Sequence, residues 1–293
     1  MNRFNIIFRK YILFWALAAM VVGYLAGRYN PYRVYMLRVL ITPLLFIMIF
    51  IMIFPTNLRS LLKLKYYTLP MIISFILFLI SPFLAYLVSG VIPQDFRFLR
   101  TGIIISSTVP PEAMLSAWTG FLEGDILLSL IIQSFTFIMW ILLVPFGLSL
   151  FFGNSSGFAL MTVVKNLFFL IVIPFIIAGF LKKVFKEYLT ADVLERLKPT
   201  LSSISGLIEI FVILISVGLS SEIIAKNPII ILWGFFTSVF YYALTFIIAL
   251  YLTRLFRLEY HTSIPLVYEN ATKNLPIAMA VAISSFQNQT VLG

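Results

Sequence analysis

Long apolar blocks separated by short polar stretches run through the whole chain. A helix needs about 20 mostly apolar residues to cross a hydrocarbon core about 30 Å thick, because it rises about 1.5 Å per residue. Nine blocks meet this requirement and are predicted to be membrane-spanning helices: residues 10–27, 34–54, 68–92, 99–121, 125–151, 158–181, 200–222, 228–255 and 260–286. The pattern therefore predicts an all-α membrane protein, with the lipid bilayer as its surroundings.

The composition excludes a water-soluble enzyme. Hydrophobic residues make up 61% of the chain and charged residues 11%, whereas about 25% of the residues in a soluble domain are charged. The Lys and Arg residues gather at the ends of the apolar blocks and not along one face, so no nucleic-acid partner is expected. The chain has no Cys, which excludes disulfides and thiolate metal sites.

The distribution of basic residues predicts the orientation. Of the 21 Lys and Arg residues, 13 lie in the alternate loops on the side of the amino terminus and 6 on the other side. Because loops rich in Lys and Arg stay in the cytoplasm, we expect a multi-pass protein of the plasma membrane with a cytoplasmic amino terminus. The first block carries basic residues at both ends and no cleavage site, so it should remain as a helix. The longest polar stretch, Lys182 to Pro199, predicts a short surface helix between two halves.

Two predicted spans, the fourth and the ninth, are interrupted by proline and polar residues. The interruptions cover about residues 106–116 and 269–276 and include Pro110, Pro111 and Pro276. Lipid cannot satisfy the backbone groups that a broken helix frees, so we expect the two breaks to cross near mid-membrane and satisfy each other. The alternative is that these prolines only kink two continuous helices.

The matching positions of the breaks predict two inverted repeats of five helices. A half with an odd number of spans places the next half upside down, as in many secondary transporters. Residues 1–152 form the first repeat in this scheme and residues 153–293 the second. The second repeat then lacks its last helix.

Five ionisable residues lie inside apolar spans: Glu112, Lys165, Glu209, Glu269 and Lys273. An unpaired charge at the centre of a membrane helix costs about 2.5–3.5 kcal/mol on insertion scales. Glu269 and Lys273 are four residues apart and share a helix face if the helix continues through them. We expect a charge cluster at the crossing, with Lys273 held by Glu269 or by Glu112. The alternative is that Glu269 and Lys273 form only a local structural pair.

The other two charges are less informative. Glu209 is either a proton or cation site or a buried carboxyl group that a neighbour keeps neutral. Lys165 is close enough to the end of its span to reach the interface, and no role is assigned to it.

The charges and the breaks favour a carrier. Positive half-helix ends and Lys273 favour a small organic anion as the substrate, and the candidate substrate-binding residues are Glu112, Asn270, Thr272, Lys273 and Asn274. An intramembrane protease is not expected, because every Asp lies at a segment end and the single His lies at the start of the ninth span. A channel is the other alternative, but charges of both signs at mid-membrane suit a carrier better.

The interrupted segments resemble a known family. The run Tyr268-Glu-Asn-Ala-Thr-Lys-Asn-Leu-Pro-Ile-Ala-Met-Ala-Val-Ala282 is similar to the second crossover of the bile acid:sodium symporter and arsenite-efflux (bile/arsenite/riboflavin transporter) superfamily. Its first crossover is similar to Pro110–Ser116 followed by Trp118 and Gly124-Asp125-x-x-x-Ser129-x-x-x-Gln133. The resemblance implies ten helices, a panel domain and a core domain, and alternating access by movement of one against the other.

The resemblance also implies a coupling ion. Ser116, Ser129, Gln133 and Glu269 match the positions that form the first sodium site in symporter members, so Na⁺ is the implied ion and no other cofactor is expected. Lys273 stands where the symporters have a Gln that helps to bind a second sodium. Its ammonium group would take the place of that cation, which favours one sodium, a proton or no coupling ion.

An efflux function is the alternative within the same superfamily. The arsenite exporters have a Cys near the position of Pro111, and this chain has none, although Met114–Thr119 with Trp118 resembles that branch. The expected function is therefore a sodium- or proton-coupled secondary active transporter of a small organic anion. The alternatives are an arsenite, metalloid or other anion efflux permease and a channel. The expected partners are the substrate and the bilayer, with the protein a monomer or a homodimer.

Overall fold

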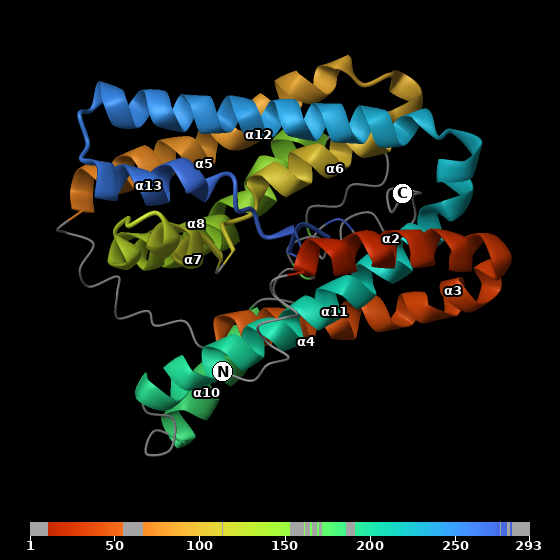
Figure 1. Cartoon of the computed structure of the whole chain (residues 1–293), viewed down its shortest axis with the longest axis horizontal. Coiled ribbons are helices and arrows are strands. Elements are labelled where there is room, and N and C mark those ends of the chain that lie inside the picture. The colour runs from red at the N-terminus through yellow and green to blue at the C-terminus, as the bar shows by residue number, and fades with distance from the viewer. Residues whose placement is uncertain are drawn as a thin grey trace. The chain divides into compact units, whose positions relative to one another are not determined.

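The computed structural model describes residues 11–54, 67–112, 114–152, 161, 165, 169, 172–185, 191–275, 277–279 and 282. Within these residues the regular structure is helical, apart from one isolated β-bridge. Figure 1 shows the helices: α2 (Ile12–Tyr29), α3 (Pro31–Leu37), α4 (Ile41–Ile53), α5 (Thr68–Val88), α6 (Arg97–Thr108), α7 (Met114–Phe121), α8 (Ile126–Phe152), α10 (Ile173–Val184), α11 (Ala191–Lys226), α12 (Ile229–Leu255) and α13 (Tyr260–Glu269). Three short 3₁₀ turns complete the described elements: η1 (Arg38–Leu40), η3 (Ser89–Val91) and η4 (Gln94–Phe96).

The prediction of an all-α membrane protein is confirmed. Six helical segments in the described part are long and apolar enough to cross a membrane: Ile12–Tyr29, Pro31–Ile51, Thr68–Val91, Ile126–Val144, Ser203–Lys226 and Ile229–Leu255. The fourth and ninth predicted spans are not continuous, because each is interrupted at its polar cluster and yields only short helices. The predicted span at 158–181 lies partly outside the described residues, and its described end belongs to α10.

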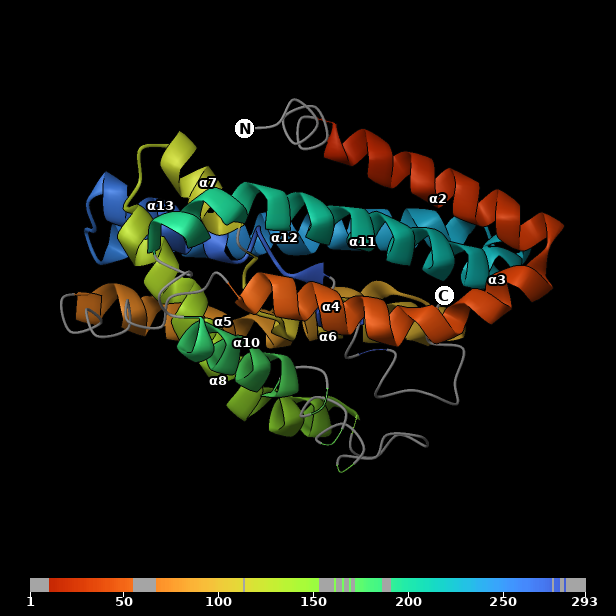
Figure 2. The same cartoon turned by 90° about the horizontal axis from the view of Figure 1, so that it is seen from below.

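The first compact unit contains residues 1–56, 161–228 and 292–293. Its longest helix, α11, packs along α2 and α4, as Figure 2 shows. With 36 residues α11 is about 54 Å long, which exceeds the hydrocarbon thickness of about 30 Å. The surface helix expected before Pro199 is therefore wrong as a separate element, because it is continuous with the seventh span. Residues 186–190, between α10 and α11, lie outside the described part.

Glycines let α2 and α11 approach closely. Gly23 and Gly27 lie one turn apart on α2, and both are buried. A Cβ atom on Gly23 would overlap the backbone carbonyl of Leu214, and one on Gly27 would overlap the carbonyl of Gly218. Small residues at this spacing favour close packing of membrane helices, where lipid offers no hydrophobic driving force.

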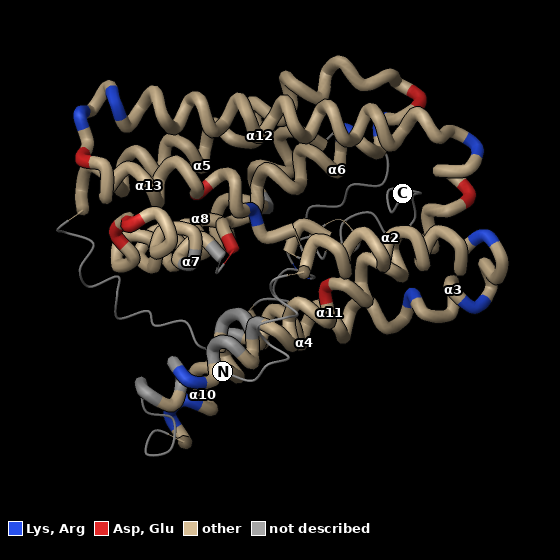
Figure 3. The backbone as a smooth tube through the Cα atoms, viewed as in Figure 1, with Lys and Arg blue, Asp and Glu red and all other residues tan. Residues whose placement is uncertain are grey.

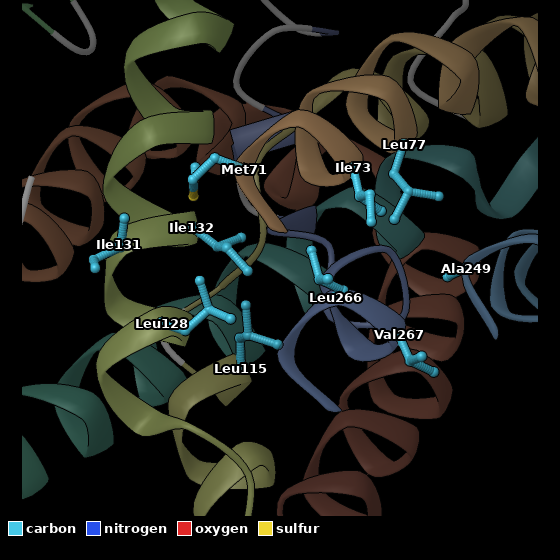
Figure 4. Packing of buried hydrophobic residues seen from close by; sticks show 10 residues of the cluster. All are labelled: Met71, Ile73, Leu77, Leu115, Leu128, Ile131, Ile132, Ala249, Leu266 and Val267. Carbon is cyan, nitrogen blue, oxygen red and sulfur yellow. The ribbon is translucent and has the colours of Figure 1, made fainter. Parts of the chain in front are cut away.

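The second compact unit contains residues 57–160 and 229–291. In it, α5 packs against α6, α8, α12 and α13, and α13 also packs against α7 and α8. Figure 4 shows the buried apolar side chains that these helices share: Met71, Ile73, Leu77, Leu115, Leu128, Ile131, Ile132, Ala249, Leu266 and Val267. This core holds the two interrupted segments beside each other within one unit.

Charged residues lie mainly near helix ends, as Figure 3 shows. Such a distribution avoids the cost of placing charges in the hydrocarbon. Each compact unit takes helices from both halves of the chain. The two predicted repeats, which divide at residues 152 and 153, are defined only by the order of the spans along the sequence. They stay a prediction.

The glycine contact gives a stability prediction. Gly27→Ala should destabilise the protein by about 1–3 kcal/mol, because the added methyl group meets backbone that cannot move aside cheaply. The measurement is the temperature of unfolding in detergent. Gly147→Ala in α8 is the matched control, since a Cβ there meets no atom of the described residues within 4 Å. Equal unfolding temperatures for the two variants would contradict the close contact.

Candidate functional site

The two breaks contact each other through their backbones. The amide of Glu112 donates to the carbonyl of Thr272 at 2.6 Å, and the amide of Asn274 donates to the carbonyl of Pro110 at 3.0 Å. The residues between these bonds form an isolated antiparallel β-bridge. The contact expected from the polar clusters is therefore present, and each break satisfies the other's freed backbone groups.

The local sequence explains where the helices stop. Pro110 and Pro111 have no N–H group and fit an extended backbone, so α6 ends at Thr108 and Val109 is extended. The hydroxyl groups of Ser107 and Thr108 donate to carbonyls three residues earlier, at 2.6 and 2.7 Å. These bonds give both buried hydroxyl groups an acceptor within the last turns of α6.

In the second break, α13 ends at Glu269 and helix resumes after Asn274. The side chain of Asn274 caps this restart, because its Oδ1 atom accepts from the amide of Ile277 at 3.1 Å. Pro276, which the sequence placed in the same break, lies outside the described residues.

Lys273 is buried, with 5% of its surface exposed. Its Nζ atom donates to the carbonyl of Val109 at 3.0 Å and lies 6.0 Å from the ring centroid of Phe78. A carboxylate was expected in this role, but the hydrogen bond goes to the carbonyl that follows α6. A positive charge is favourable there, because the end of a helix carries partial negative charge.

Glu269 and Asn270 carry buried oxygen atoms that lack hydrogen-bond partners in the described part of the chain. Each residue is 1% exposed. Oε1 of Glu269 accepts from the hydroxyl of Ser74 at 2.9 Å, whereas Oε2 of Glu269 and Oδ1 of Asn270 accept no hydrogen bond from the described residues. Glu269 and Lys273 attract each other electrostatically, but the hydrogen bonds of their charged groups go to different partners.

Three of the four predicted sodium ligands form one cluster. Ser116 on α7 accepts from Nε2 of Gln133 at 2.6 Å and from the hydroxyl of Ser129 at 3.0 Å. Glu269 comes from α13, which packs against both α7 and α8. Its hydrogen bond within the described part goes to Ser74 of α5 and not to this cluster.

The predicted substrate-binding residues all lie in or beside the crossing. Asn270, Lys273 and Asn274 are buried, whereas Glu112 and Thr272 are half-buried. The hydroxyl of Thr272 donates to the carbonyl of Tyr268 at 2.9 Å, so it completes the last turn of α13. The two remaining intramembrane charges lie in the first compact unit, where Lys165 is exposed and Glu209 is half-buried.

Hydrogen bonds of Asp125 connect the start of α8 to the starts of α5 and α13. Asp125 caps α8 by accepting from the amide of Leu128 at 2.9 Å, and its other oxygen accepts from the hydroxyl of Tyr67 at 2.7 Å. Burial and this bond to Asp125 raise the pKa of Tyr67 to about 12, so the phenol stays protonated at neutral pH. The amide of Asp125 donates to the carbonyl of His261 at the start of α13, at 2.9 Å.

Sequence reasoning missed one face of α5. Ser74 bonds to Glu269, Phe78 lies under Lys273, and Ser81 donates to the carbonyl of Ser107 at 2.9 Å. Ser81 also shares a 2.5 Å hydrogen bond with the hydroxyl of Tyr241 on α12. The spacing of two serines by seven residues in an apolar span places both on one helix face and is a signal for this contact.

Comparison with known proteins agrees with this geometry. The model of the Sodium Bile acid symporter family matches residues 42–227, which is more than half of the chain. The matched range includes the first break and the cluster around Ser116, and it ends before the second break. No curated protein matches the chain. The chain belongs to the sodium bile acid symporter family, and it is therefore a multi-pass membrane transporter.

Proposed function

We propose that this protein is a secondary active transporter that moves a small organic anion across the plasma membrane, coupled to one Na⁺ or one proton. The observation that carries the proposal is the pair of buried oxygen atoms, Oε2 of Glu269 and Oδ1 of Asn270, that have no hydrogen-bond partner among the described residues. A buried acceptor without a partner costs about 1–3 kcal/mol, and more when it is charged. A cation or a proton bound there removes that cost.

The helix ends explain why a cation is favoured at Glu269. α13 ends at this residue, so its last carbonyls add partial negative charge to the negative charge of the carboxylate. The two negative contributions lie together at 1% exposure, where water screens them little. Broken helices of transporters bind Na⁺ or protons at such carboxyl-terminal ends.

The cluster of hydroxyl and amide groups on α7 and α8 supplies further oxygen ligands for Na⁺. Ser116 and Ser129 offer hydroxyl oxygens, and Gln133 offers a side-chain carbonyl. α13 packs against both helices, so Glu269 is the fourth member of the proposed site. The same carboxyl group would carry the proton if the coupling ion is H⁺.

Lys273 serves as a second, covalently attached cation in this proposal. Its ammonium group is buried at the end of α6 and attracts Glu269, which lies four residues earlier in the same break. A permanent cation at this position leaves one ion to be supplied from solution. The stoichiometry is therefore one coupling ion per transport cycle.

The opposite helix ends favour an anionic substrate. α7 begins at Met114, and a further helix begins after Asn274, so two amino-terminal ends with partial positive charge flank the crossing. Half-helices of transporters point such ends at the acidic groups of their substrates. The basic residues on the side of the amino terminus support a cytoplasmic position for that terminus.

The role of Glu269 is tested by its response to sodium. Glu269→Gln keeps the size of the side chain but removes its charge, so the increase in unfolding temperature that NaCl gives over choline chloride should disappear. Glu259→Gln, at the exposed start of the same helix, is the matched control and should keep the increase. A full sodium response in Glu269→Gln would contradict the proposed site.

A proton-coupled transporter gives a different result in the same experiment. The wild-type protein would then show no sodium response, and lowering the pH would stabilise it in a way that Glu269→Gln abolishes. The absence of both the sodium and the pH responses in the wild-type protein would refute coupling through Glu269.

The role of Lys273 is tested by stoichiometry. Lys273→Gln removes the attached cation and supplies a neutral oxygen ligand. The Hill coefficient for sodium-dependent stabilisation should rise from about one towards two. Lys226→Gln, which removes an exposed partner of Glu222, is the control and should leave the coefficient unchanged. A wild-type coefficient near two would contradict the single-ion proposal.

A further inference from the structure

An apolar groove of about 510 Å³ lies between the end of α5 and the first half of α12, in the second compact unit. Leu87, Val88 and Val91 line one side, and Trp233, Phe236 and Phe240 line the other. Most of the surface of Leu87 and Phe236 is exposed, 69% and 62% respectively. The groove contains none of the residues assigned to the coupling ion or to the substrate.

The position of the groove favours an acyl chain as its occupant. Both bordering helices belong to segments that are long and apolar enough to cross the membrane. Thr237 is the single hydroxyl-bearing residue of the lining, and it is 3% exposed. An apolar concavity at membrane depth gains dispersion contacts only when hydrocarbon fills it. Lipid chains are the hydrocarbon that surrounds a membrane protein.

A positive charge lies near the same end of the two helices. The guanidinium carbon of Arg100 on α6 is 4.4 Å from the ring centroid of Tyr86, which precedes the α5 side of the groove. Leu99 reaches the other side, because a Cβ atom on Gly234 would lie 3.4 Å from its Cδ1 atom. The first turns of α6 therefore touch α5 and α12 beside the groove.

Arg100 is a half-buried cation beside the groove. Its Nε atom is buried and donates to no acceptor in the described part of the chain. The local charge is positive, because Arg97 and Arg100 outnumber the acidic Asp95 that precedes them. A guanidinium group binds a phosphate through charge-assisted hydrogen bonds, and basic residues at the membrane surface attract anionic lipids.

We propose that the groove binds an acyl chain of an anionic phospholipid whose phosphate group is bound by Arg100. The lipid covers the apolar side chains of α5 and α12, and its phosphate group binds the half-buried guanidinium group of Arg100 at the start of α6. This proposal does not depend on the identity of the transported solute or of the coupling ion.

Tryptophan fluorescence tests the proposal directly, because Trp233 lines the groove. Two proteins are compared: one keeps Trp233 and Trp140, and the other keeps Trp15 and Trp140, with Phe at the remaining tryptophan positions. Trp140 is fully buried and gives a constant background, whereas Trp15 on α2 is 42% exposed and reports bulk lipid. Both are reconstituted in phosphatidylcholine vesicles with a small fraction of phosphatidylglycerol brominated on its acyl chains.

Brominated phosphatidylglycerol should quench the Trp233 protein about fivefold more effectively than brominated phosphatidylcholine does at the same low mole fraction, as expected for one basic residue near the surface. Brominated phosphatidylcholine should quench both proteins alike. Arg100→Gln should lower the quenching of Trp233 by brominated phosphatidylglycerol to the phosphatidylcholine level. Arg254→Gln, at the other end of α12, is the matched control and should change nothing.

Three results would overturn the proposal. Equal quenching of Trp233 by the two brominated lipids would mean that the groove has no preference for the anionic lipid. Unchanged quenching in Arg100→Gln would remove the phosphate contact. Absence of quenching of Trp233 by either lipid would mean that a part of the protein covers the groove.

Discussion

The hydrogen bonds between two broken backbones are the constraint on which the crossing depends. In lipid an interrupted helix has no water to satisfy its free amide and carbonyl groups. The bonds from Glu112 to Thr272 and from Asn274 to Pro110 let each break satisfy the other. Neither break is stable without its partner, so the fold must bring segments about 160 residues apart in sequence into register. The buried core shared by α5, α7, α8 and α13 holds them there.

The two buried charges at the crossing lie at helix ends of partial negative charge. The end of α6 attracts Lys273, whereas the end of α13 repels Glu269. Lys273 sits at the end of α6, where a positive charge is favourable. Glu269 sits at the end of α13, where its negative charge adds to that of the helix. The protein keeps the unfavourable arrangement and leaves Oε2 of Glu269 without a partner among the described residues. This unfavourable buried charge is the basis of the ion site proposed at Glu269.

The helix α5 connects several of these features. One face carries Ser74, Phe78 and Ser81, which contact Glu269, Lys273 and the end of α6. Leu87 and Val88, near its carboxyl-terminal end, line the apolar groove against α12. Ser74, Phe78 and Ser81 lie one to two turns apart, so they share one face of α5.

The sequence alone determined the membrane class, the breaks and the family resemblance, because hydrophobic length and the backbone chemistry of proline act locally. The family resemblance grouped Ser116, Ser129 and Gln133 with Glu269, and the sequence pattern identified Glu269 and Lys273 as charges inside a span. It did not reveal that Lys273 would bind the carbonyl of Val109, that Ser74 would hold Glu269, or that the surface helix would continue into α11. Those outcomes depend on which atoms of distant segments meet, and a one-dimensional pattern carries no information about that distance. Only the tertiary structure decided them, because in a dry interior each polar atom must use whichever partner the packing places within hydrogen-bonding reach.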